Sequence, residues 1–432
     1  MMSLTPEERQ TGQDNYYEAV GCTRRDFMKQ IITTGLVTGG GLGAMYFGYD
    51  KITDPVRVGV IGTGDEGNVL IGAINPEYVQ VVAISDIRPS SIHRAFHGDW
   101  ASDSAIAVRK GLMAVYDWKT EQEARQHVKV YDAENGGYEA LIADPDVEAV
   151  IIALPLHLHA PAACKAMKAK KHVLTEKLMA HNVAQCKVMG RLAYDQGVYL
   201  ATGHQRHYSV LYDNAVNLIR WGLLGQIHHI RAQWHRGNLP GNDSWQQPLP
   251  GGEVAFGGGK SENKITKQLD KFRDALAKST DAAKTELLEK QIAQWVAWDS
   301  DKTVKAEENG YISTTLDNGR PRPALEELCR WRLWERTGGG LMAELGSHQL
   351  DASGIFISAL RADGKKAHPL TVHAVGGRHV FPLDRDSGDH VYCMYEFPGP
   401  AYDVKEFDVG YKDPTMNFPN PDKDIKPYNE DP

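Results

Sequence analysis

Short apolar runs alternate with stretches of helical period between Val56 and Gly203. The runs read VRVGVIG, VQVVAIS, VEAVIIALP, KHVLTEK and VYLATG, and they are rich in β-branched residues. Short, mainly apolar runs of this kind predict strands that are buried on both faces. Segments such as Ala160–Lys170 and Val183–Gln196 have the pattern of helices between them. Repeated strand–helix units of this kind predict an α/β fold with a right-handed, mostly parallel sheet.

A glycine-rich turn follows the first strand. It has the spacing Gly62-x-Gly64-x-x-Gly67, and the second strand ends at Asp86, nineteen residues after Gly67. Glycines at this place let the backbone approach a pyrophosphate, which the N-terminus of the next helix attracts. The alternative is a turn that only joins strand to helix, but the strand–turn–helix context favours a Rossmann dinucleotide site. Asp86 would accept hydrogen bonds from the adenosine ribose and repel a 2′-phosphate, so NAD is the expected cofactor and NADP is less favoured, although Arg88 partly offsets this charge.

Ligands on parallel sheets bind at the carboxyl ends of the strands. Three groups of residues fall there: Leu154–His159, Glu176-Lys177 and Gly203–Tyr208. The side chains expected around this one crevice are Pro155, His157, His159, Lys177, His204, Gln205, Arg206 and Tyr208. The pair His157 and His159 also allows a metal site, but no carboxylate lies close to it in sequence, so no metal is expected.

The second half of the chain shows weaker periodicity. Residues 226–235, QIHHIRAQWH, have strand character, and residues 262–298 have the period of a polar amphipathic helix. LTVHAVGGRHVF and HVYCMYEF predict two later strands, before a tail rich in Pro, Asp and Lys. Six tryptophans occupy this region: Trp234, Trp245, Trp295, Trp298, Trp331 and Trp334. They could form a platform for carbohydrate, or they could dock amphipathic helices on their own domain.

The N-terminal segment departs from this globular pattern. TRRDFMK stands just before the Gly-rich apolar run QIITTGLVTGGGLGAMYFGYD. The match at Thr23, Arg24, Arg25, Phe27 and Lys29 resembles a twin-arginine translocation signal, whereas an ordinary amphipathic helix start suits the many glycines poorly. The run is too interrupted to predict a membrane span, and no small-x-small cleavage site stands out. We therefore expect a protein that folds around its cofactor and is then exported to the periplasm by the twin-arginine machinery, with membrane anchoring if the signal is retained.

The overall composition is that of a globular protein. Of 432 residues, 42% are apolar and 24% are charged, and this length predicts two or three domains. A net charge of −8 and the lack of a long basic run argue against a nucleic-acid partner. The five cysteines form neither a disulfide framework nor a zinc motif, and packing roles are expected for them: Cys22, Cys164, Cys186, Cys329 and Cys393.

The order of these motifs resembles that of the glucose–fructose oxidoreductase / inositol dehydrogenase (Gfo/Idh/MocA) family. The matching elements are the glycine turn, Asp86, Pro155-x-x-x-His159, Glu176-Lys177, RHYSVLYDNAVNLIRWGLLGQI and GGGLMAELGSHQLD. The resemblance implies a Rossmann NAD-binding domain at 51–203 and, at 204–432, an α/β domain whose open, mostly antiparallel sheet covers the nicotinamide. Residues 1–50 would be the signal and linker, and a helical insertion would occupy about 240–335. Fewer strands are predicted than the family sheet has, so we expect a sheet that is shortened or completed by another subunit.

The resemblance, together with the chemistry of alcohol oxidation, assigns roles to the site residues. His348 would be the base, Lys177 would hold the substrate hydroxyl and stabilise an alkoxide, and Glu344, one helical turn before His348, would orient it. The family's usual Glu-Lys-Pro ends in Leu178 here, and its usual aspartate is Glu344. Cofactor contacts are expected from Gly62, Gly64, Gly67, Asp86, Arg88, Pro155, His159, Glu176 and Lys177. Substrate contacts are expected from His204, Arg206, Tyr208, Trp234 and His235.

Three classes of function remain open at this point. The first is an NAD-dependent oxidoreductase that acts on a hydroxyl of a sugar, cyclitol or glycoside. The second is a redox-assisted glycoside hydrolase, in which a transient keto-sugar allows elimination and the ketone is then reduced back. The third is a binding or assembly protein with a vestigial cofactor. The expected partners are a small carbohydrate, the export machinery and a second copy of the chain.

Overall fold

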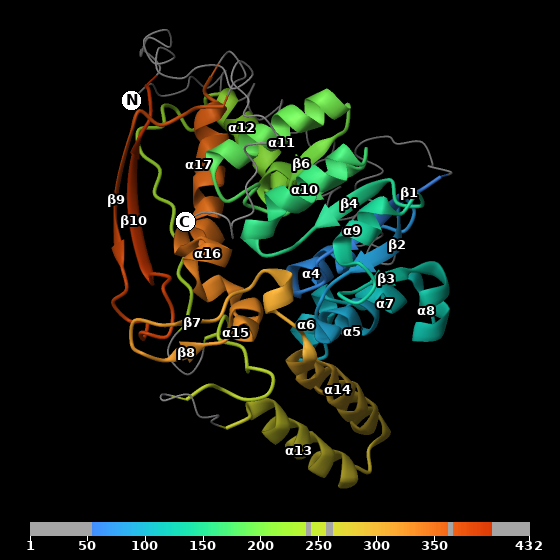
Figure 1. The fold of residues 1–432 in the computed structure, drawn as a ribbon. Coiled ribbons are helices and arrows are strands. Elements are labelled where there is room, and N and C mark those ends of the chain that lie inside the picture. Colours follow the sequence, from blue (N-terminus) through green and yellow to red (C-terminus); the bar gives the residue numbers. More distant parts are fainter. Residues whose placement is uncertain (1–53, 239–242, 256–261, 362–365, 400–432) are drawn as a thin grey trace.

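The structure is a computed structural model, and it describes residues 54–238, 243–255, 262–361 and 366–399. The expected twin-arginine signal at Arg24-Arg25 lies outside the described residues. Within them, no helix is both long enough and apolar enough to cross a membrane. Figure 1 shows a Rossmann half and a second half, here called the covering half, which comprises the described residues from 204 onward.

The Rossmann half is built on a six-stranded sheet in the order β3-β2-β1-β4-β5-β6. All neighbouring strands in it are parallel. This is the strand order of dinucleotide-binding sheets, in which the chain reverses direction across the sheet between β1 and β4. The strands are β1 (Val56–Ile61), β2 (Val79–Ser85), β3 (Lys129–Tyr131), β4 (Ala149–Ile152), β5 (His172–Thr175) and β6 (Leu200–Thr202).

Successive apolar residues of each strand feed two separate cores. Val60 and Ile84 point to one face, whereas Ile61 and Ala83 point to the other, as the two-residue period of a strand requires. Helices cover both faces, which explains why the strands are almost unbroken apolar runs. The helices of this half are α4 (Asp65–Ala73), α5 (Pro89–His97), α6 (Asp103–Val108), α7 (Gly111–Tyr116), α8 (Glu121–His127), α9 (Gly137–Ala143), α10 (His159–Lys168) and α11 (Val183–Gln196).

The covering half consists of helices, long coil and two small antiparallel sheets, β7–β8 and β9–β10. In Figure 1, α17 stands between the Rossmann half and the β9–β10 pair, while α13 and α14 protrude as an antiparallel pair. Its strands are β7 (Thr314–Thr315), β8 (Pro321–Arg322), β9 (Thr371–Gly377) and β10 (His390–Glu396). Its helices are α12 (Val210–Arg220), α13 (Lys264–Ala277), α14 (Ala282–Ser300), α15 (Ala324–Cys329), α16 (Glu335–Gly338) and α17 (Ser347–Ser358), with a π-helix at Met342–Gly346 and 3₁₀ turns at Gln205–Tyr208, Asp301–Thr303, Glu307–Asn309 and Trp331–Leu333. A further 3₁₀ turn, Leu156–Leu158, belongs to the Rossmann half.

One predicted strand is absent from the covering half. Residues 226–235 take neither helix nor strand, and most of their side chains are exposed. A strand needs a hydrogen-bonded neighbour, and the described strands β9 and β10 pair with each other instead. The two later strands were predicted correctly, and the amphipathic stretch 262–298 is a pair of helices, α13 and α14, rather than one.

Buried ion pairs hold part of the covering half together. On α15, Glu326 and Glu327 are both fully buried. Glu326 accepts two hydrogen bonds from Arg320, at 2.7 and 2.9 Å, and one from Arg330 at 2.9 Å. Glu327 pairs with Arg322 and Arg336. A buried charge is tolerated only when it is paired, so α15 can lie in this buried place because the guanidinium groups pair with its two carboxylates.

Candidate active site

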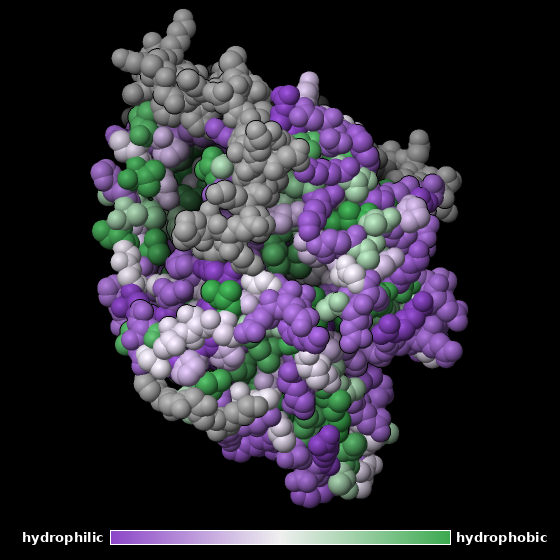
Figure 2. All heavy atoms as spheres, in the orientation of Figure 1, coloured by the Kyte–Doolittle hydropathy of each residue, from purple (hydrophilic) through white to green (hydrophobic). Residues whose placement is uncertain are grey.

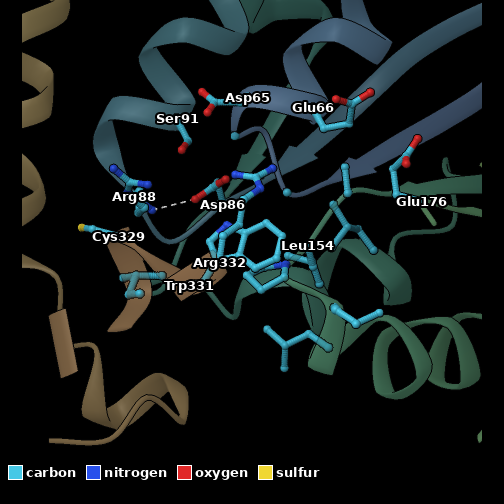
Figure 3. A pocket seen from close by; sticks show the side chains of 18 of the residues that line it. Asp65, Glu66, Asp86, Arg88, Ser91, Leu154, Glu176, Cys329, Trp331 and Arg332 are labelled. Atoms are coloured by element: carbon cyan, nitrogen blue, oxygen red, sulfur yellow. Dashed lines mark hydrogen bonds between the residues drawn. The ribbon is translucent and has the colours of Figure 1, made fainter. Parts of the chain in front are cut away.

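A cavity of about 1030 Å³ lies between the carboxyl edge of the parallel sheet and the covering half. The Rossmann half lines it with the glycine turn and with the ends of β2, β4 and β5, and the covering half lines it with residues of α14, of the 331–332 turn and of 343–348. Figure 3 shows Asp86 and Arg88 in one part of the cavity and Glu66 and Glu176 in another, with Arg332 and Trp331 also bordering it. The predicted crevice therefore exists, and both halves contribute to it.

The glycine turn is shaped for close approach by a ligand. A Cβ on Gly62, whose φ is +85°, would meet the Ala153 carbonyl oxygen at 2.6 Å, and a Cβ on Gly67 would meet the Gly62 oxygen at 2.1 Å. A Cβ on Gly64 would meet nothing within 4 Å, because this residue faces the cavity. Gly64 also caps α4 without any side-chain hydrogen bond, so the helix start can donate its free N–H groups to a ligand. The turn fits a dinucleotide pyrophosphate.

Asp86 borders the cavity at the end of β2. Its carboxylate accepts hydrogen bonds from the Thr63 N–H at 2.8 Å and from the Arg88 N–H at 2.9 Å, the latter drawn in Figure 3. Burial raises the pKa of Asp86, although these two N–H groups act in the opposite direction. The Arg88 side chain turns away to Asp301, to which its Nε donates at 2.9 Å. Asp301 is a residue that no motif in the sequence singled out.

His159 lines the cavity, but it acts on the protein backbone. Its Nδ1 lies 2.6 Å from the Leu178 carbonyl oxygen and its Nε2 lies 2.8 Å from the Leu154 carbonyl oxygen. The ring thereby ties the end of β4 to the end of β5. His157 is buried and packs edge-on against Tyr311, with ring centroids 5.7 Å apart. In the part of the chain that the structure describes, no three His, Cys, Asp or Glu side chains are placed to hold a metal ion.

Lys177 joins the two halves of the site. It follows β5, and its Nζ donates to the main-chain oxygen of Glu344 at 2.8 Å. The preceding Glu176 also lines the cavity, and burial, with the nearby Glu66 carboxylate, raises the pKa of Glu176 to about 7. Gly203 makes room for this carboxylate, since a Cβ there would lie 2.6 Å from its Oε1.

The predicted contact between Glu344 and His348 is wrong. The Glu344 carboxylate accepts a hydrogen bond from Arg332 Nε at 3.0 Å. The cause is the π-helix at Met342–Gly346, because its extra residue per turn breaks the i,i+4 alignment on which the prediction rested. Glu344 therefore holds Arg332 over the cavity, while its carbonyl oxygen holds Lys177.

His348 is held by Arg206 instead. The Arg206 Nη1 lies 3.1 Å from the Nδ1 of His348. A guanidinium only donates, so Nδ1 accepts and the neutral ring carries its proton on Nε2. Burial, together with the positive charges of Lys177 and Arg206, lowers the pKa of His348 to about 4. His348 is thus neutral at neutral pH, and its basic nitrogen faces a cation.

The residues predicted to bind substrate separate into two groups. Trp234 borders the cavity, with its ring 5.3 Å from that of His348. Arg206 does not border the cavity, but it contacts His348, which does. The hydroxyl of Tyr208 donates to the Thr202 carbonyl oxygen at 3.0 Å, and the side chain is 64% exposed. His204, half-buried beside Thr202, and the exposed His235 do not border the cavity, and neither does Tyr208. Substrate contacts from these three residues stay predictions.

The tryptophans also divide. Trp234, Trp245, Trp298 and Trp331 border the cavity. Trp334 is fully buried in a cluster with Leu333 and Leu345, and Trp295 packs on Phe272 and Trp298. Trp295 and Trp334 thus have packing roles, whereas a carbohydrate platform stays a prediction for the four tryptophans that border the cavity. Arg332 stacks on Trp331, at 4.3 Å from the ring centroid.

The parallel sheet, its strand order and the open glycine turn define a dinucleotide-binding domain. Residues 56–204 match the model of the Gfo/Idh/MocA oxidoreductase family, described as an oxidoreductase family with an NAD-binding Rossmann fold. Over this segment the chain is therefore similar to that family, and its fold is that of an NAD-binding Rossmann domain, as the resemblance seen in the sequence implied. The residues identified above fit the cofactor: the glycine turn would hold its pyrophosphate and Asp86 its adenosine ribose.

Individual proteins match this chain only over part of their length and at 30% identity or less in the examples that follow. A curated relative, 1-carboxy-3-chloro-3,4-dihydroxycyclohexa-1,5-diene dehydrogenase of Comamonas testosteroni, is 30% identical over 221 residues, which are 50% of this chain and 47% of the relative. A glycosyl hydrolase family 109 protein of Solibacter usitatus is 25% identical over 49% of this chain and 46% of its own. The chain thus spans about half the length of these curated relatives. The crystal structure of an NAD-binding oxidoreductase from Klebsiella pneumoniae aligns with a TM-score of 0.42 and 17% identity, over 80% of this chain and 64% of that one.

Proposed function

We propose that this protein is an NAD-dependent oxidoreductase that acts on a hydroxyl of a sugar, cyclitol or glycoside. One observation carries the proposal: Lys177 and His348 come from opposite halves and border the same cavity as the dinucleotide-binding turn. Bound NAD would supply a hydride acceptor. The remaining requirements, a proton acceptor and a cation near the developing alkoxide, are met by side chains of the chain itself.

Lys177 would hold the substrate oxygen. Its ammonium group already has one partner, the Glu344 carbonyl oxygen at 2.8 Å, and it keeps two further N–H donors for a hydroxyl. A positive charge beside that hydroxyl favours its deprotonated form. The bordering Trp234 and Trp331 would pack on the apolar faces of a ring.

His348 would take the hydroxyl proton only after Arg206 has released it. With Arg206 on Nδ1, the ring presents Nε2–H and can donate but not accept. Substrate hydroxyls that draw Arg206 away would free the imidazole lone pair. Arg206 is then a positioning residue that keeps His348 neutral until a substrate arrives.

The test begins with the purified protein. Nucleotide released from it and identified by mass should be NAD or NADH, and NADH absorbance should rise when sugars or cyclitols are added with NAD. Asp86→Ala should weaken NAD binding. A protein that binds NAD but turns over no hydroxyl compound would support the third class, a binding protein with a vestigial cofactor, and would overturn the proposal.

Redox-assisted glycoside hydrolysis is the second candidate. The likeness to a glycosyl hydrolase family 109 protein favours it, at 25% identity over half the chain. A protein that retains its NAD through each cycle would need no external acceptor. Release of the leaving group from an aryl glycoside without net formation of NADH would support this candidate over the first.

The N-terminal sequence supports a proposal on location. Arg24-Arg25, with Phe27 and Lys29, would direct the folded, cofactor-loaded protein through the twin-arginine pathway. Arg24→Lys with Arg25→Lys should leave the folded protein in the cytoplasm. Equal recovery of the double variant in the periplasm would dispose of this assignment.

A second copy of the chain is the partner proposed for the β9–β10 sheet. This pair exposes large apolar side chains, and Figure 2 shows hydrophobic atoms at the edge where it lies. They include Val372 at 53%, Val375 at 70%, Tyr392 at 63% and Met394 at 71% exposure. Val375→Lys with Met394→Lys should convert an oligomer into a monomer in sedimentation velocity, and a wild-type monomer at micromolar concentration would contradict the proposal.

A further inference from the structure

A carboxylate of the helical insertion lies against the cofactor domain. Asp301 follows α14, and its side chain is fully buried. Its Oδ1 accepts a hydrogen bond from the Ser90 N–H at 2.9 Å, and its Oδ2 accepts from the Ser90 hydroxyl at 2.6 Å and from Arg88 Nε at 2.9 Å. All three donors belong to the segment that directly follows Asp86, at the start of α5.

These three donors are of the kind that bind a phosphate. A guanidinium, a hydroxyl and an N–H at a helix start are strong donors for a phosphate anion, and an arginine near the ribose-binding acid is where Rossmann sites accommodate a 2′-phosphate. Here each of the three groups donates a hydrogen bond to Asp301, the guanidinium through its Nε. We propose that Asp301 is a built-in substitute for the 2′-phosphate and makes this site select NAD against NADP, an inference that rests on the proposed NAD binding.

The charges at this corner of the cavity point the same way. Asp86 and Asp301 bring two carboxylates. The Arg88 guanidinium pairs with Asp301, whereas Asp86 accepts a hydrogen bond from the main-chain N–H of Arg88. A 2′-phosphate would add between one and two further negative charges. To reach Arg88 it would have to displace Asp301 and leave a fully buried carboxylate without partners, which is costly.

A neutral ribose hydroxyl meets a different surface. Ser91 borders the cavity from α5, and its buried Oγ has no hydrogen-bond partner among the described residues. A serine hydroxyl can both donate and accept, as a ribose hydroxyl can. The corner therefore keeps one neutral hydroxyl for the adenosine end of NAD, while the Arg88 guanidinium is already paired with Asp301.

The insertion does not depend on Asp301 for its position. On α14, Gln294 donates to Asp99 at 2.8 Å and accepts from the Trp100 N–H at 2.7 Å, so separate hydrogen bonds hold the helix on the Rossmann half. An asparagine at 301 keeps the size of the side chain and one acceptor oxygen. Asp301→Asn should therefore change the charge and leave the packing in place.

The experiment measures the dissociation constants of NAD and NADP by titration calorimetry at one fixed salt concentration. The wild type should bind NAD at least about 100-fold more tightly than NADP. Asp301→Asn should tighten NADP binding at least about tenfold, and the ratio of the NADP dissociation constant to the NAD dissociation constant should fall accordingly. Asp274→Asn, which removes the same charge from the exposed face of α13, is the matched control and should leave the ratio unchanged. The double variant Asp301→Asn with Arg88→Gln should lose the gain, because the freed guanidinium supplies it.

A variant that leaves Asp301 in place gives an independent reading should Asp301→Asn fail to fold. Asp86→Ala should relax the preference for NAD, yet it should still bind NAD about tenfold more tightly than NADP. Equal affinities in Asp86→Ala, no tightening of NADP binding in folded Asp301→Asn, or a wild type that binds both nucleotides equally would each overturn the role of Asp301. A wild type that binds neither nucleotide would overturn the cofactor site itself, which separates the two failures.

Discussion

The Rossmann half and the covering half bury different chemistry. On the Rossmann sheet, two clusters of apolar side chains fill the space between strands and helices, and residues such as Val60, Ile61 and Ile152 are fully buried there. In the covering half, one buried apolar cluster is organised around Trp334, and beside it lie the fully buried Glu326 and Glu327 with their arginines. The Rossmann half is stabilised mainly by the burial of apolar surface, whereas the covering half depends in part on paired charges.

This difference matters for the site because the two halves meet there. Lys177 extends from a strand end that is fixed by an apolar core, whereas the side chains of His348 and Arg332 are each held by a polar partner, Arg206 and Glu344. Hydrogen bonds and ion pairs are directional, so they can aim a side chain closely, but each fails when one partner is lost. We therefore expect changes in the covering half to affect orientation and charge at the site first.

The largest effect is expected from removing one reactive group from each half. Loss of a general base costs about 10²–10⁴ in rate. His348→Ala and Lys177→Ala should each lose about that much kcat while the affinity for NAD stays within about threefold. The double variant should lose much less than the product of the two, because residues that act as a unit are non-additive. Steady-state kinetics and calorimetric NAD titration would measure both quantities.

Lys284→Ala, on the exposed face of α14, is the control for loss of a lysine. It should retain full activity. If His348→Ala kept more than a tenth of the wild-type kcat, the covering half would contribute no reacting group, and the site would belong to the Rossmann half alone.

The Rossmann half was predictable from sequence because its pattern is local. Apolar runs gave the five strands β1, β2, β4, β5 and β6, and α11 has the predicted bounds, Val183–Gln196. Strand β3 was not predicted, since three residues carry too little periodicity. In the covering half, the strand predicted at 226–235 failed because its residues found no neighbouring strand, which depends on contacts that a local pattern does not contain.

The site shows the same division. Gly64, Asp86 and Lys177 were identified because they sit at fixed places relative to strands, and all three border the cavity. Asp301 was not identified, because it lies 211 residues from Ser90 in sequence and nothing local marks it. The orientation of His348 was predicted on α-helical spacing, and a π-helix changed it. Long-range pairing and helix irregularity are properties of the folded chain, and composition or period does not predict them.

The second effect tests the two kinds of core directly. Glu327→Gln leaves Arg322 and Arg336 near a neutral group in a buried place, which should cost about 3–5 kcal/mol. Leu141→Ala in the Rossmann core should cost about 2–5 kcal/mol by opening a cavity. Urea unfolding midpoints would measure both. Glu308→Gln removes a carboxylate that is 68% exposed and pairs with Lys305, so it should cost less than about 1 kcal/mol.

An equal, small cost for Glu327→Gln and Glu308→Gln would contradict the view that paired charges hold the covering half. The same result would also make the orientation of Arg336, which Glu327 fixes, irrelevant to stability.

A third, smaller effect separates two glycines of the same turn. Gly64→Ala places its Cβ in the open cavity, so the fold should be unchanged while the affinity for NAD falls about tenfold or more. Gly67→Ala drives its Cβ into the Gly62 carbonyl oxygen and should cost about 1–3 kcal/mol of stability. Calorimetric NAD titration and urea unfolding would distinguish them. A Gly64→Ala protein with wild-type NAD affinity would show that the pyrophosphate does not lie on this turn.

The smallest expected effect concerns the pH at which His348 titrates. Burial and the cations Lys177 and Arg206 lower the pKa of His348 to about 4, so the ring stays neutral until the pH falls well below its ordinary value. Arg206→Gln removes one of those cations, and the pKa should rise by about one unit. The protonated fraction then increases at a higher pH, and the acid limb of kcat/KM should move up by the same amount.

Arg220→Gln, an exposed position on α12, removes a positive charge at the far end of the helix that follows Arg206 and should leave the limb in place. Nitrogen-15 shifts of the imidazole would report the same change directly, because the wild-type ring should carry its proton on Nε2 and the Arg206→Gln ring should populate both tautomers. If the acid limb of kcat/KM and the tautomer were both unchanged in Arg206→Gln, Arg206 would control neither the pKa nor the tautomer of His348. The covering half would then position its histidine by packing alone.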